Sequence, residues 1–366
     1  MLRLLCTAEF DDGWAERFGK LVEMDRVGFS LDKDPDKRMG KEQIIKALQG
    51  YDIHISGYEK LSEEVLYQCP DLKLILSVRD GPEENIDIRA CTRLGIPVLF
   101  SSGRCERSVP EFTFLAMMMM AKPVLQASHV FRMEKWTKKN GLRLRRINES
   151  SAEMSGKTVG IVGLGRNGMG LAARCRAFQM HVVGYDPYVD KRRSDILQID
   201  LATLEELFSV SDFVVLMARV TDETRHMINR KLLGRMKQDA CLINTARAAL
   251  VDTQALEDVL KEGRIKAALD VFDQEPLPED SALYTIPEER LLLTPHLAGV
   301  SGERIVYQSE KLYQALTLYL SGQLPPNIAN REVFDTDCFR SRGGLLYRCL
   351  PQAAQNTEET MGNKMD

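Results

Sequence analysis

A short β-branched run at residues 158–162 is followed directly by Gly-Leu-Gly-Arg-Asn-Gly at 163–168. Of all features of the sequence, this strand-like run with its glycine loop restricts the possible folds most strongly. Residues 169–178 can form a helix, and residues 181–185 resemble a second strand that ends before Asp186. A glycine triplet alone is weak evidence. Here it follows a strand, opens a helix and precedes an acidic residue at the usual spacing of roughly 20 residues. The sequence therefore predicts a dinucleotide-binding strand–helix–strand unit.

Each glycine of this loop has a structural role. Gly163 permits the tight turn, Gly165 lets the backbone approach a pyrophosphate, and Gly168 allows the helix to pack closely on the strand. Arg166 and Asn167 open the helix, whose first N–H groups are unpaired and carry a partial positive charge. We expect these five residues to bind the cofactor; the alternative is a glycine-rich turn without a ligand.

Asp186 ends the second strand, where its carboxylate can accept hydrogen bonds from the adenosine ribose hydroxyls. The same negative charge would repel a 2′-phosphate, so NAD is expected rather than NADP. Lys191, Arg192 and Arg193 follow closely enough to keep NADP as an alternative.

Strand-like and helix-like segments alternate along the chain, which is typical of an α/β fold with a parallel sheet. Segments 52–56, 72–78 and 96–100 are strand-like, and a long helix is expected from Pro110. A second α/β segment runs from about residue 156 to 295. A length of 366 residues suits two domains better than one.

Composition excludes several classes of protein. The formal net charge of −4 gives no global attraction to nucleic acid, and the longest apolar runs are too short to cross a bilayer. No signal peptide is visible at the N-terminus. The eight cysteines include no Cys-x-x-Cys pair and no histidine cluster accompanies them, so no metal site is predicted. We expect a soluble cytoplasmic protein with reduced thiols and no nucleic-acid or membrane partner.

Three later segments, 241–247, 268–276 and 291–299, place polar residues after apolar runs. In an open parallel sheet, ligands bind beyond the carboxyl ends of the strands, which is where these polar residues fall. A ligand site built from all three segments is therefore expected.

These segments and the glycine loop resemble the D-isomer-specific 2-hydroxyacid dehydrogenase family, which includes D-3-phosphoglycerate, D-lactate and glyoxylate/hydroxypyruvate enzymes. The strongest matches are the glycine loop with Asp186, Asn-Thr-Ala-Arg at 244–247, the segment 270–276, and Pro-His-Leu-Ala-Gly at 295–299. The resemblance covers roughly residues 50–328. It implies an NAD-dependent oxidoreductase that transfers a hydride between nicotinamide and C2 of a small D-2-hydroxy acid or 2-keto acid.

The resemblance also implies two Rossmann-like domains, with a doubly wound nucleotide-binding sheet inserted into a flavodoxin-like substrate domain. The expected parts are residues 1–107 of the substrate domain, an NAD-binding domain at 108–295, and a returning helix at 296–328 that completes the substrate domain. Residues 329–366 are polar with little periodicity, and we expect them to be loosely ordered. A homodimer is implied, formed largely through the nucleotide domain and its methionine-rich helix.

Chemistry assigns roles to three of the matched residues. Arg247 can hold a keto-acid carboxylate with its planar two-point fork. His296 is the family-matched proton donor among five histidines, and Glu275 would favour its charged form. The alternative for these residues is an ordinary salt-bridge network at a domain interface.

Other matched residues are expected to contact the two ligands. Thr245, Ala246 and Asp270 fall at cofactor positions of the family, with Asp270 orienting the nicotinamide carboxamide. Arg79, Asp80 and Gly81 begin the loop expected to bind substrate. This loop lacks the second glycine of the family's usual Arg-x-Gly-x-Gly, and its Glu83 or Glu84 would disfavour anionic substrates unless turned outward.

This interpretation has two rivals, one a subclass of dehydrogenase and the other from a different functional class. Formate dehydrogenases resemble the same fold but replace the acidic partner of the histidine with an amide, and Glu275 argues against them. An NAD(H)-sensing interaction protein of the transcriptional-corepressor type resembles the family even in its Arg, Glu and His, and the irregular substrate loop keeps that alternative open. The sequence does not name the acid, phosphorylated or not.

Overall fold

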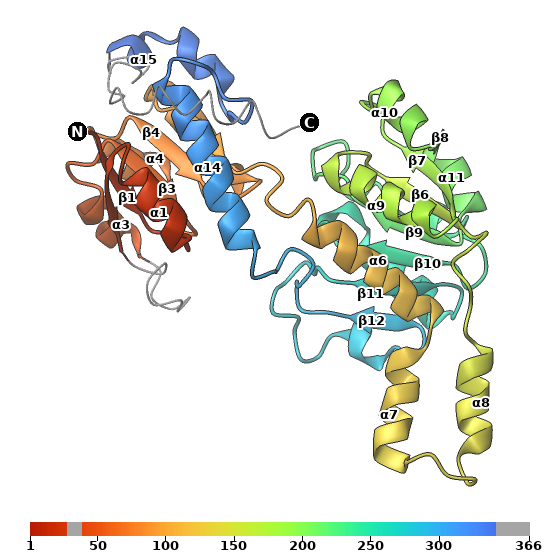
Figure 1. Cartoon of the computed structure of the whole chain (residues 1–366). Helices are drawn as coiled ribbons and strands as arrows, with labels where there is room; N and C mark the ends of the chain where they lie inside the picture. The colour runs from red at the N-terminus through yellow and green to blue at the C-terminus, as the bar shows by residue number, and fades with distance from the viewer. Residues whose placement is uncertain (28–38, 342–366) are drawn as a thin grey trace, which may run out of the picture. The chain divides into compact units, whose positions relative to one another are not determined.

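A computed structural model describes residues 1–27 and 39–341, which form two compact units. The first unit contains Met1–Arg104 and the described residues from Ser301 onward, and the second is Cys105–Val300 (Figure 1). Each unit carries its own parallel sheet, which confirms the predicted α/β class with two Rossmann-like domains. The observed divisions fall a few residues from the expected 107/108 and 295/296. His296 accordingly belongs to the second unit rather than to the returning segment, because residues 294–298 are bonded to Asp270 of that unit.

The first unit is a five-stranded sheet in the order β2-β1-β3-β4-β5, with every neighbouring pair parallel. Its strands are β1 (Arg3–Cys6), β2 (Glu23–Arg26), β3 (Ile53–Ser56), β4 (Leu74–Ser77) and β5 (Val98–Phe100). Alternate residues of a strand face opposite sides of the sheet. Leu4 and Cys6 of β1 therefore join the core with helices α1 (Asp12–Phe18) and α14 (Arg304–Leu320). Leu5 joins the opposite core, which is covered by α3 (Lys41–Ala47), α4 (Glu63–Tyr67) and α5 (Ile88–Arg93).

The second unit is a seven-stranded parallel sheet in the order β12-β11-β10-β9-β6-β7-β8. The strands are β6 (Thr158–Val162), β7 (His181–Tyr185), β8 (Asp200–Leu201), β9 (Phe213–Leu216), β10 (Cys241–Asn244), β11 (Lys266–Leu269) and β12 (Leu291–Leu293). The chain winds outward from β6 in one direction and then from β9 in the other, so the strand order reverses between these two neighbours. In doubly wound sheets a ligand crevice forms at such a switch point.

Helices cover both faces of the second sheet. The helices are α6 (Ser108–Ala121), α9 (Arg166–Ala177), α10 (Lys191–Ile196), α11 (Leu204–Val210), α12 (Arg230–Leu233) and α13 (Thr253–Lys261). The core on one face includes buried Met117 of α6 and Leu171 of α9, and the core on the other includes Leu207 of α11 and Leu256 of α13. No single helix in the described ranges is long and apolar enough to cross a membrane. Only the bent pair of α6 with the next helix, α7 (Val124–Glu134), passes that test together.

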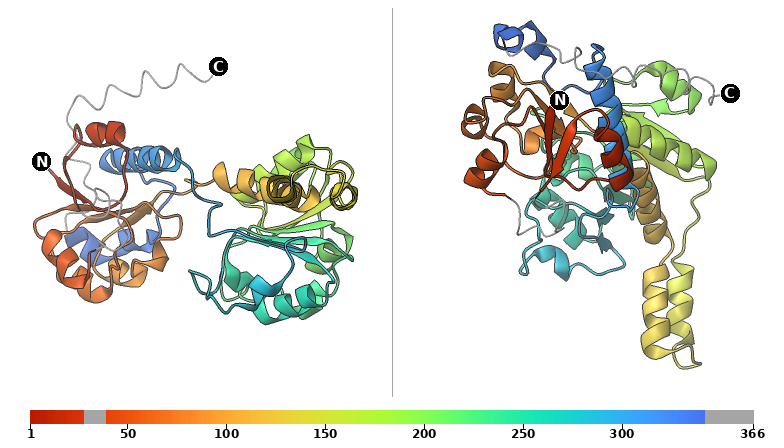
Figure 2. Two further views of the ribbon diagram at one scale, coloured as in Figure 1. Left: turned by 90° about the horizontal axis from the view of Figure 1, so that it is seen from below. Right: turned by 60° about the vertical axis from the view of Figure 1, so that its left-hand side comes forward.

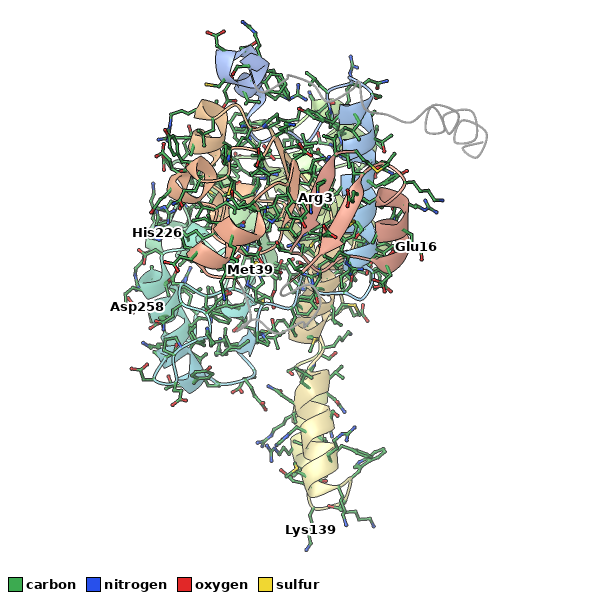
Figure 3. All side chains as sticks on the ribbon, turned by 90° about the vertical axis from the view of Figure 1, so that its left-hand side faces the viewer. Arg3, Glu16, Met39, Lys139, His226 and Asp258 are labelled. Carbon is green, nitrogen blue, oxygen red and sulfur yellow. The ribbon has the colours of Figure 1, made fainter. Side chains whose placement is uncertain are left out.

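Two further helices, α7 (Val124–Glu134) and α8 (Gly141–Glu149), run side by side as a hairpin that projects from the second unit (Figure 2). Lys139 marks its tip (Figure 3). The basic residues of this region therefore lie on an exposed helical hairpin.

The expectation of a loosely ordered segment from residue 329 is wrong for residues 329–341. Arg331–Asp335 forms a 3₁₀ helix and Asp337–Ser341 forms α15. The fully buried Asn330 accepts a bond from the Val98 N–H at 2.9 Å and donates to the Ile96 carbonyl at 3.0 Å. One buried amide and a few apolar side chains are enough to order a segment whose average composition is polar. Residues 342–366 lie outside the described residues.

Candidate active site

The glycine loop follows β6 at the switch point of the second sheet. Gly163 has a φ of +97°, and a Cβ there would lie 2.6 Å from the Ala218 nitrogen. A Cβ on Gly168 would lie 2.1 Å from the Gly163 carbonyl oxygen. A Cβ on Gly165 would meet nothing within 4 Å, so the loop is open at this one glycine. Two glycines are thus required by packing, and the third borders a space that a diphosphate group can enter.

Helix α9 begins directly after this opening. Its N-cap is Gly165, whose position carries no side-chain capping bond. The first N–H groups of a helix have no partner within the helix, and the helix dipole adds partial positive charge. Arg166 and Asn167 provide two of these N–H groups, and the Arg166 side chain pairs with Glu106 at 3.7 Å. These residues fit the diphosphate of a nicotinamide dinucleotide.

The Asp186 carboxylate, which follows β7, is hydrogen-bonded to the glycine loop. One oxygen accepts the Leu164 N–H at 2.8 Å, and the other accepts the Tyr188 N–H at 2.9 Å. An ionised carboxylate has about four lone-pair sites, so acceptor capacity remains for ribose hydroxyls. The carboxylate is therefore fixed in place before any ligand binds.

Arg247 extends from a short turn after β10. Asn244, which is 2% exposed, accepts the Ala246 N–H at 3.1 Å and donates to the Arg247 carbonyl at 3.0 Å. The Thr245 hydroxyl lies 2.7 Å from the hydroxyl of Thr113 in α6. These contacts fix the backbone of the turn, while the Arg247 guanidinium, which donates to the Ala246 carbonyl at 2.8 Å, stays exposed.

His296 and Glu275 are brought together from the segments after β12 and β11. The His296 Nδ1 lies 2.8 Å from Glu275 Oε2, and Glu275 Oε1 accepts the Phe272 N–H at 3.1 Å. Both side chains remain partly exposed, at 48% and 39%. A carboxylate on Nδ1 orients the imidazole and leaves Nε2 for a second partner. The pair can hold and release a proton at Nε2.

Asp270 is 1% exposed and bonds to the loop that carries His296. One oxygen accepts the Thr294 hydroxyl at 2.6 Å and the Leu297 N–H at 2.8 Å, and the other accepts the Ala298 N–H at 2.8 Å. The resemblance to the family implied a contact between Asp270 and nicotinamide, and that contact stays a prediction. The structure gives this carboxylate three donors from the protein itself.

The expected substrate loop lies in the first unit, after β4. Arg79 forms an ion pair with Glu84 and lies over the Tyr58 ring, 5.4 Å from its centroid. Asp80 accepts the Gly103 N–H at 3.1 Å, and Gly81 precedes a 3₁₀ turn at Pro82–Glu84. Glu84 is therefore turned to Arg79 and offsets its charge.

Sequence reasoning missed three residues that support the site. These are Asn244, Thr113 and Thr294, which bond to the backbone of the Arg247 turn, to Thr245 and to Asp270. Asn244 at a strand end and Thr294 two residues before His296 were visible in the sequence and could have indicated such support. Thr113 carried no signal, because its partner lies 132 positions away.

Three neighbouring strands of one sheet each precede one of these residues: β10 precedes Arg247, β11 precedes Glu275 and β12 precedes His296. The carboxyl ends of parallel neighbours lie at one edge. The second unit therefore collects the cofactor loop, a cation and an acid–base pair along one sheet edge, without any contribution from the first unit.

Known proteins share this chain's pattern over most of its length. Residues 114–298 match the model described as D-isomer specific 2-hydroxyacid dehydrogenase, NAD binding domain. A glyoxylate reductase of Korarchaeum cryptofilum is 35% identical over 311 residues, covering 83% of this chain and 91% of the relative. A D-3-phosphoglycerate dehydrogenase of Methanocaldococcus jannaschii is 34% identical over 294 residues, covering 79% of this chain and 54% of the relative.

The fold also matches solved structures. The apo D-mandelate dehydrogenase of Rhodotorula graminis superimposes with a TM-score of 0.78 at 20% identity, covering 90% of this chain and 97% of the other. Identity this low supports the fold alone.

Proposed function

Because this chain belongs to the D-isomer-specific 2-hydroxyacid dehydrogenase family and is an NAD-dependent dehydrogenase, we propose that it interconverts a D-2-hydroxy acid and the matching 2-keto acid. The contact of 2.8 Å between His296 and Glu275 carries the proposal. When bound, the nicotinamide supplies the hydride to substrate C2 or accepts it from C2.

His296 acts as the general acid and base. During reduction its Nε2 donates a proton to the carbonyl oxygen of the 2-keto acid, and during oxidation it takes the proton of the 2-hydroxyl group. Glu275 bonds to Nδ1, orients the ring and stabilises the imidazolium. The hydrogen bond that the Phe272 N–H donates to Glu275 Oε1 holds the carboxylate in this orientation.

Arg247 binds the substrate carboxylate. Its backbone is held by Asn244, and its exposed guanidinium offers two parallel donors to a carboxylate. Anchoring the carboxylate fixes the neighbouring C2 carbonyl relative to His296, which lowers the entropy cost of the reaction.

The cofactor site uses the glycine loop, Thr245, Ala246 and Asp186. The opening at Gly165 and the start of α9 receive the diphosphate. The preorganised Asp186 receives the ribose hydroxyls and repels a 2′-phosphate, so NAD is preferred over NADP.

We also propose that two copies of the chain associate through the second unit. The α7–α8 hairpin exposes Phe131, Trp136 and Leu142, at 54%, 76% and 74%. Residues 122–149 contain eight Lys or Arg and two Glu, a net +6; because the chain totals −4, the remainder carries −10. An apolar, basic hairpin complements a second copy with an acidic surface.

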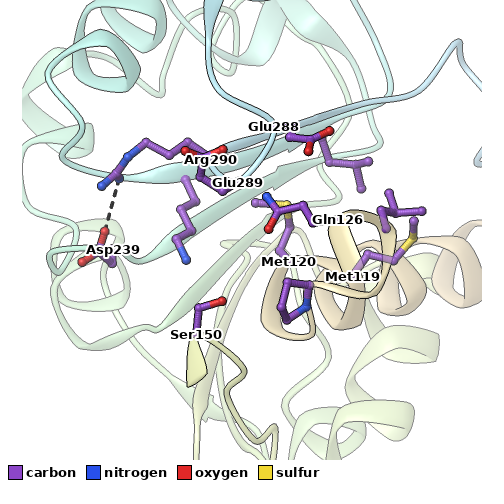
Figure 4. A pocket seen from close by; sticks show the side chains of 12 residues that line it. Met119, Met120, Gln126, Ser150, Asp239, Glu288, Glu289 and Arg290 are labelled. Carbon is purple, nitrogen blue, oxygen red and sulfur yellow. Dashed lines mark hydrogen bonds and ion pairs between the residues drawn. The ribbon is translucent and has the colours of Figure 1, made fainter. Parts of the chain in front are cut away.

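A pocket near the base of the hairpin has apolar and charged lining. Met119 and Met120 form an apolar part, and Glu288 and Glu289 lie across from it (Figure 4). Lys266 and Arg290 also line the pocket. The molar mass in solution, measured by light scattering, tests the association: a dimer is expected, and a monomer at micromolar concentration rejects it.

The proposed activity is tested by incubating the purified chain and NADH with glyoxylate, hydroxypyruvate, its 3-phosphate and pyruvate. Oxidation of NADH with at least one acid, yielding the D-hydroxy product, supports it. Binding of NADH without turnover of any acid would instead favour an NAD(H)-sensing protein, which the named relatives do not support.

A further inference from the structure

We propose that Asp270 is a positioning residue: its carboxylate holds the loop that carries His296 in the conformation that the acid–base step needs. This inference rests on the proposed role of His296. It differs from the cofactor contact that the family resemblance implies for Asp270.

The first support is the set of donors around the carboxylate. Thr294, Leu297 and Ala298 all donate to Asp270 at 2.6 to 2.8 Å, and Asp270 is 1% exposed. Buried polar groups gain most when every bond is made, since an unmade bond leaves an uncompensated desolvation cost. The carboxylate therefore uses three of its roughly four acceptor sites on residues 294–298.

The second support is the backbone of His296. Its φ is +54°, a left-handed conformation that is unfavourable for a residue with a Cβ. Thr294 precedes it and Leu297 follows it, and both bond to the same Asp270 oxygen. The strained residue is held from both sides, which is how such conformations persist at functional sites.

The third support is that one segment holds both the backbone and the ring of His296. Asp270 holds the backbone on either side, and Glu275, five positions later, holds Nδ1. The Asp270 N–H donates to the Asn244 carbonyl at 3.0 Å, and Asn244 also holds the Arg247 turn. Asp270 thus connects the loop of the proton donor to the turn of the carboxylate anchor.

Only a carboxylate suits this position. An amide has one acceptor oxygen, and its NH₂ group would face a backbone N–H or the threonine hydroxyl. Asp270→Asn should therefore release part of the loop. Thr294→Val removes one donor with little change in shape, and Thr294→Ser restores the hydroxyl.

The experiment compares these three variants and wild type for NADH binding without substrate, followed by fluorescence, and for turnover at saturating NADH. We expect Asp270→Asn and Thr294→Val to lower kcat by about tenfold or more, since small misplacements of catalytic groups have effects of up to about a hundredfold. For Thr294→Val the dissociation constant of NADH should change less than about twofold, and Thr294→Ser should recover most of the kcat.

The opposite pattern overturns the proposal. If Asp270→Asn weakens NADH binding strongly while kcat at saturation is retained, Asp270 is a cofactor ligand. If Thr294→Val has wild-type kcat, the loop needs no such support; this variant decides the question even if Asp270→Asn does not fold. His296→Ala separates the two claims: wild-type turnover there refutes the proposed acid–base role, whereas loss there with normal Thr294→Val refutes the positioning role alone.

Discussion

The Nδ1 atom of His296 lies 2.8 Å from Oε2 of Glu275, although 20 residues separate them along the chain. The strands that precede these two residues, β12 and β11, are parallel neighbours, and their carboxyl ends place the two side chains at one edge. The second unit alone therefore contains a complete acid–base pair.

Glu275→Gln should lower kcat for keto-acid reduction. Glu275 bonds to Nδ1 of His296, orients the ring and leaves Nε2 for the substrate. An amide in its place has one acceptor oxygen and an NH₂ group that donates, so the ring is held less well. We expect kcat to fall by about tenfold or more, while the dissociation constant of NADH changes little. Steady-state rates at saturating NADH measure the loss, and a kcat equal to that of wild type would contradict the role of Glu275.

Arg247→Lys should raise KM for the keto acid and lower kcat/KM, while NADH binding is retained. Lysine keeps the positive charge but loses the planar fork that binds a carboxylate at two points. Loss of one charge-assisted hydrogen bond corresponds to about 1.5–3 kcal/mol, or roughly 10- to 150-fold in kcat/KM. Steady-state kinetics with the best acid gives the value, and a change of less than about threefold would show that Arg247 does not anchor the carboxylate.

Asp186→Ser should narrow the preference for NADH over NADPH. The substitution removes the charge that repels a 2′-phosphate, and serine keeps a small polar side chain next to the loop. Titration of both cofactors against wild type and variant tests it, with His181→Gln, an exposed change on the same strand, as the control. Equal affinity of wild type for the two cofactors would remove the basis for this prediction.

His54 should make the fold less stable in acid. Burial lowers the pKa of His54 from 6.5 to about 3 in the folded protein. Below about pH 6.5 the unfolded chain therefore binds a proton that the folded chain does not, so the free energy of unfolding falls as the pH falls toward 3. The slope is at most about 1.4 kcal/mol per pH unit from this group.

Denaturant unfolding at several pH values measures that slope. His54→Gln should flatten it between pH 6.5 and 3, whereas the exposed His181→Gln should leave it unchanged. His54 bonds through Nε2 to Thr7 at 3.0 Å, so some loss of stability at neutral pH is expected in His54→Gln. An equal slope in wild type and His54→Gln would rule out this histidine as the source.

The sequence predicted the parts of the site whose signals are local. The strand, glycine loop and helix at 158–177 are contiguous, and each glycine has a reason in its own neighbourhood. Alternation of strands and helices was enough to predict an α/β fold with a parallel sheet, and the resemblance to the family implied a second one. The resemblance of segments 241–247, 268–276 and 291–299 to the family then pointed to Arg247, Glu275 and His296, although only the structure shows which of them are in contact.

The remaining features depend on contacts between distant segments. The three bonds of Asp270 join residues 24 to 28 positions apart, and motif spacing carries no information on where a carboxylate points. The pairing of Arg79 with Glu84 depends on the turn at Pro82–Glu84. Order at 329–341 depends on Asn330 bonding to β5 of the sheet, more than 230 positions earlier.

The central claim is that His296 transfers the proton in an NAD-dependent 2-hydroxyacid dehydrogenase, and His296→Ala tests it most directly. The measurement is turnover in both directions with the best acid pair, together with the dissociation constant of NADH. We predict that both rates fall by at least about a hundredfold, as is typical when a general acid–base group is removed, while NADH binding changes only a few-fold. Turnover near that of wild type in His296→Ala would contradict the account.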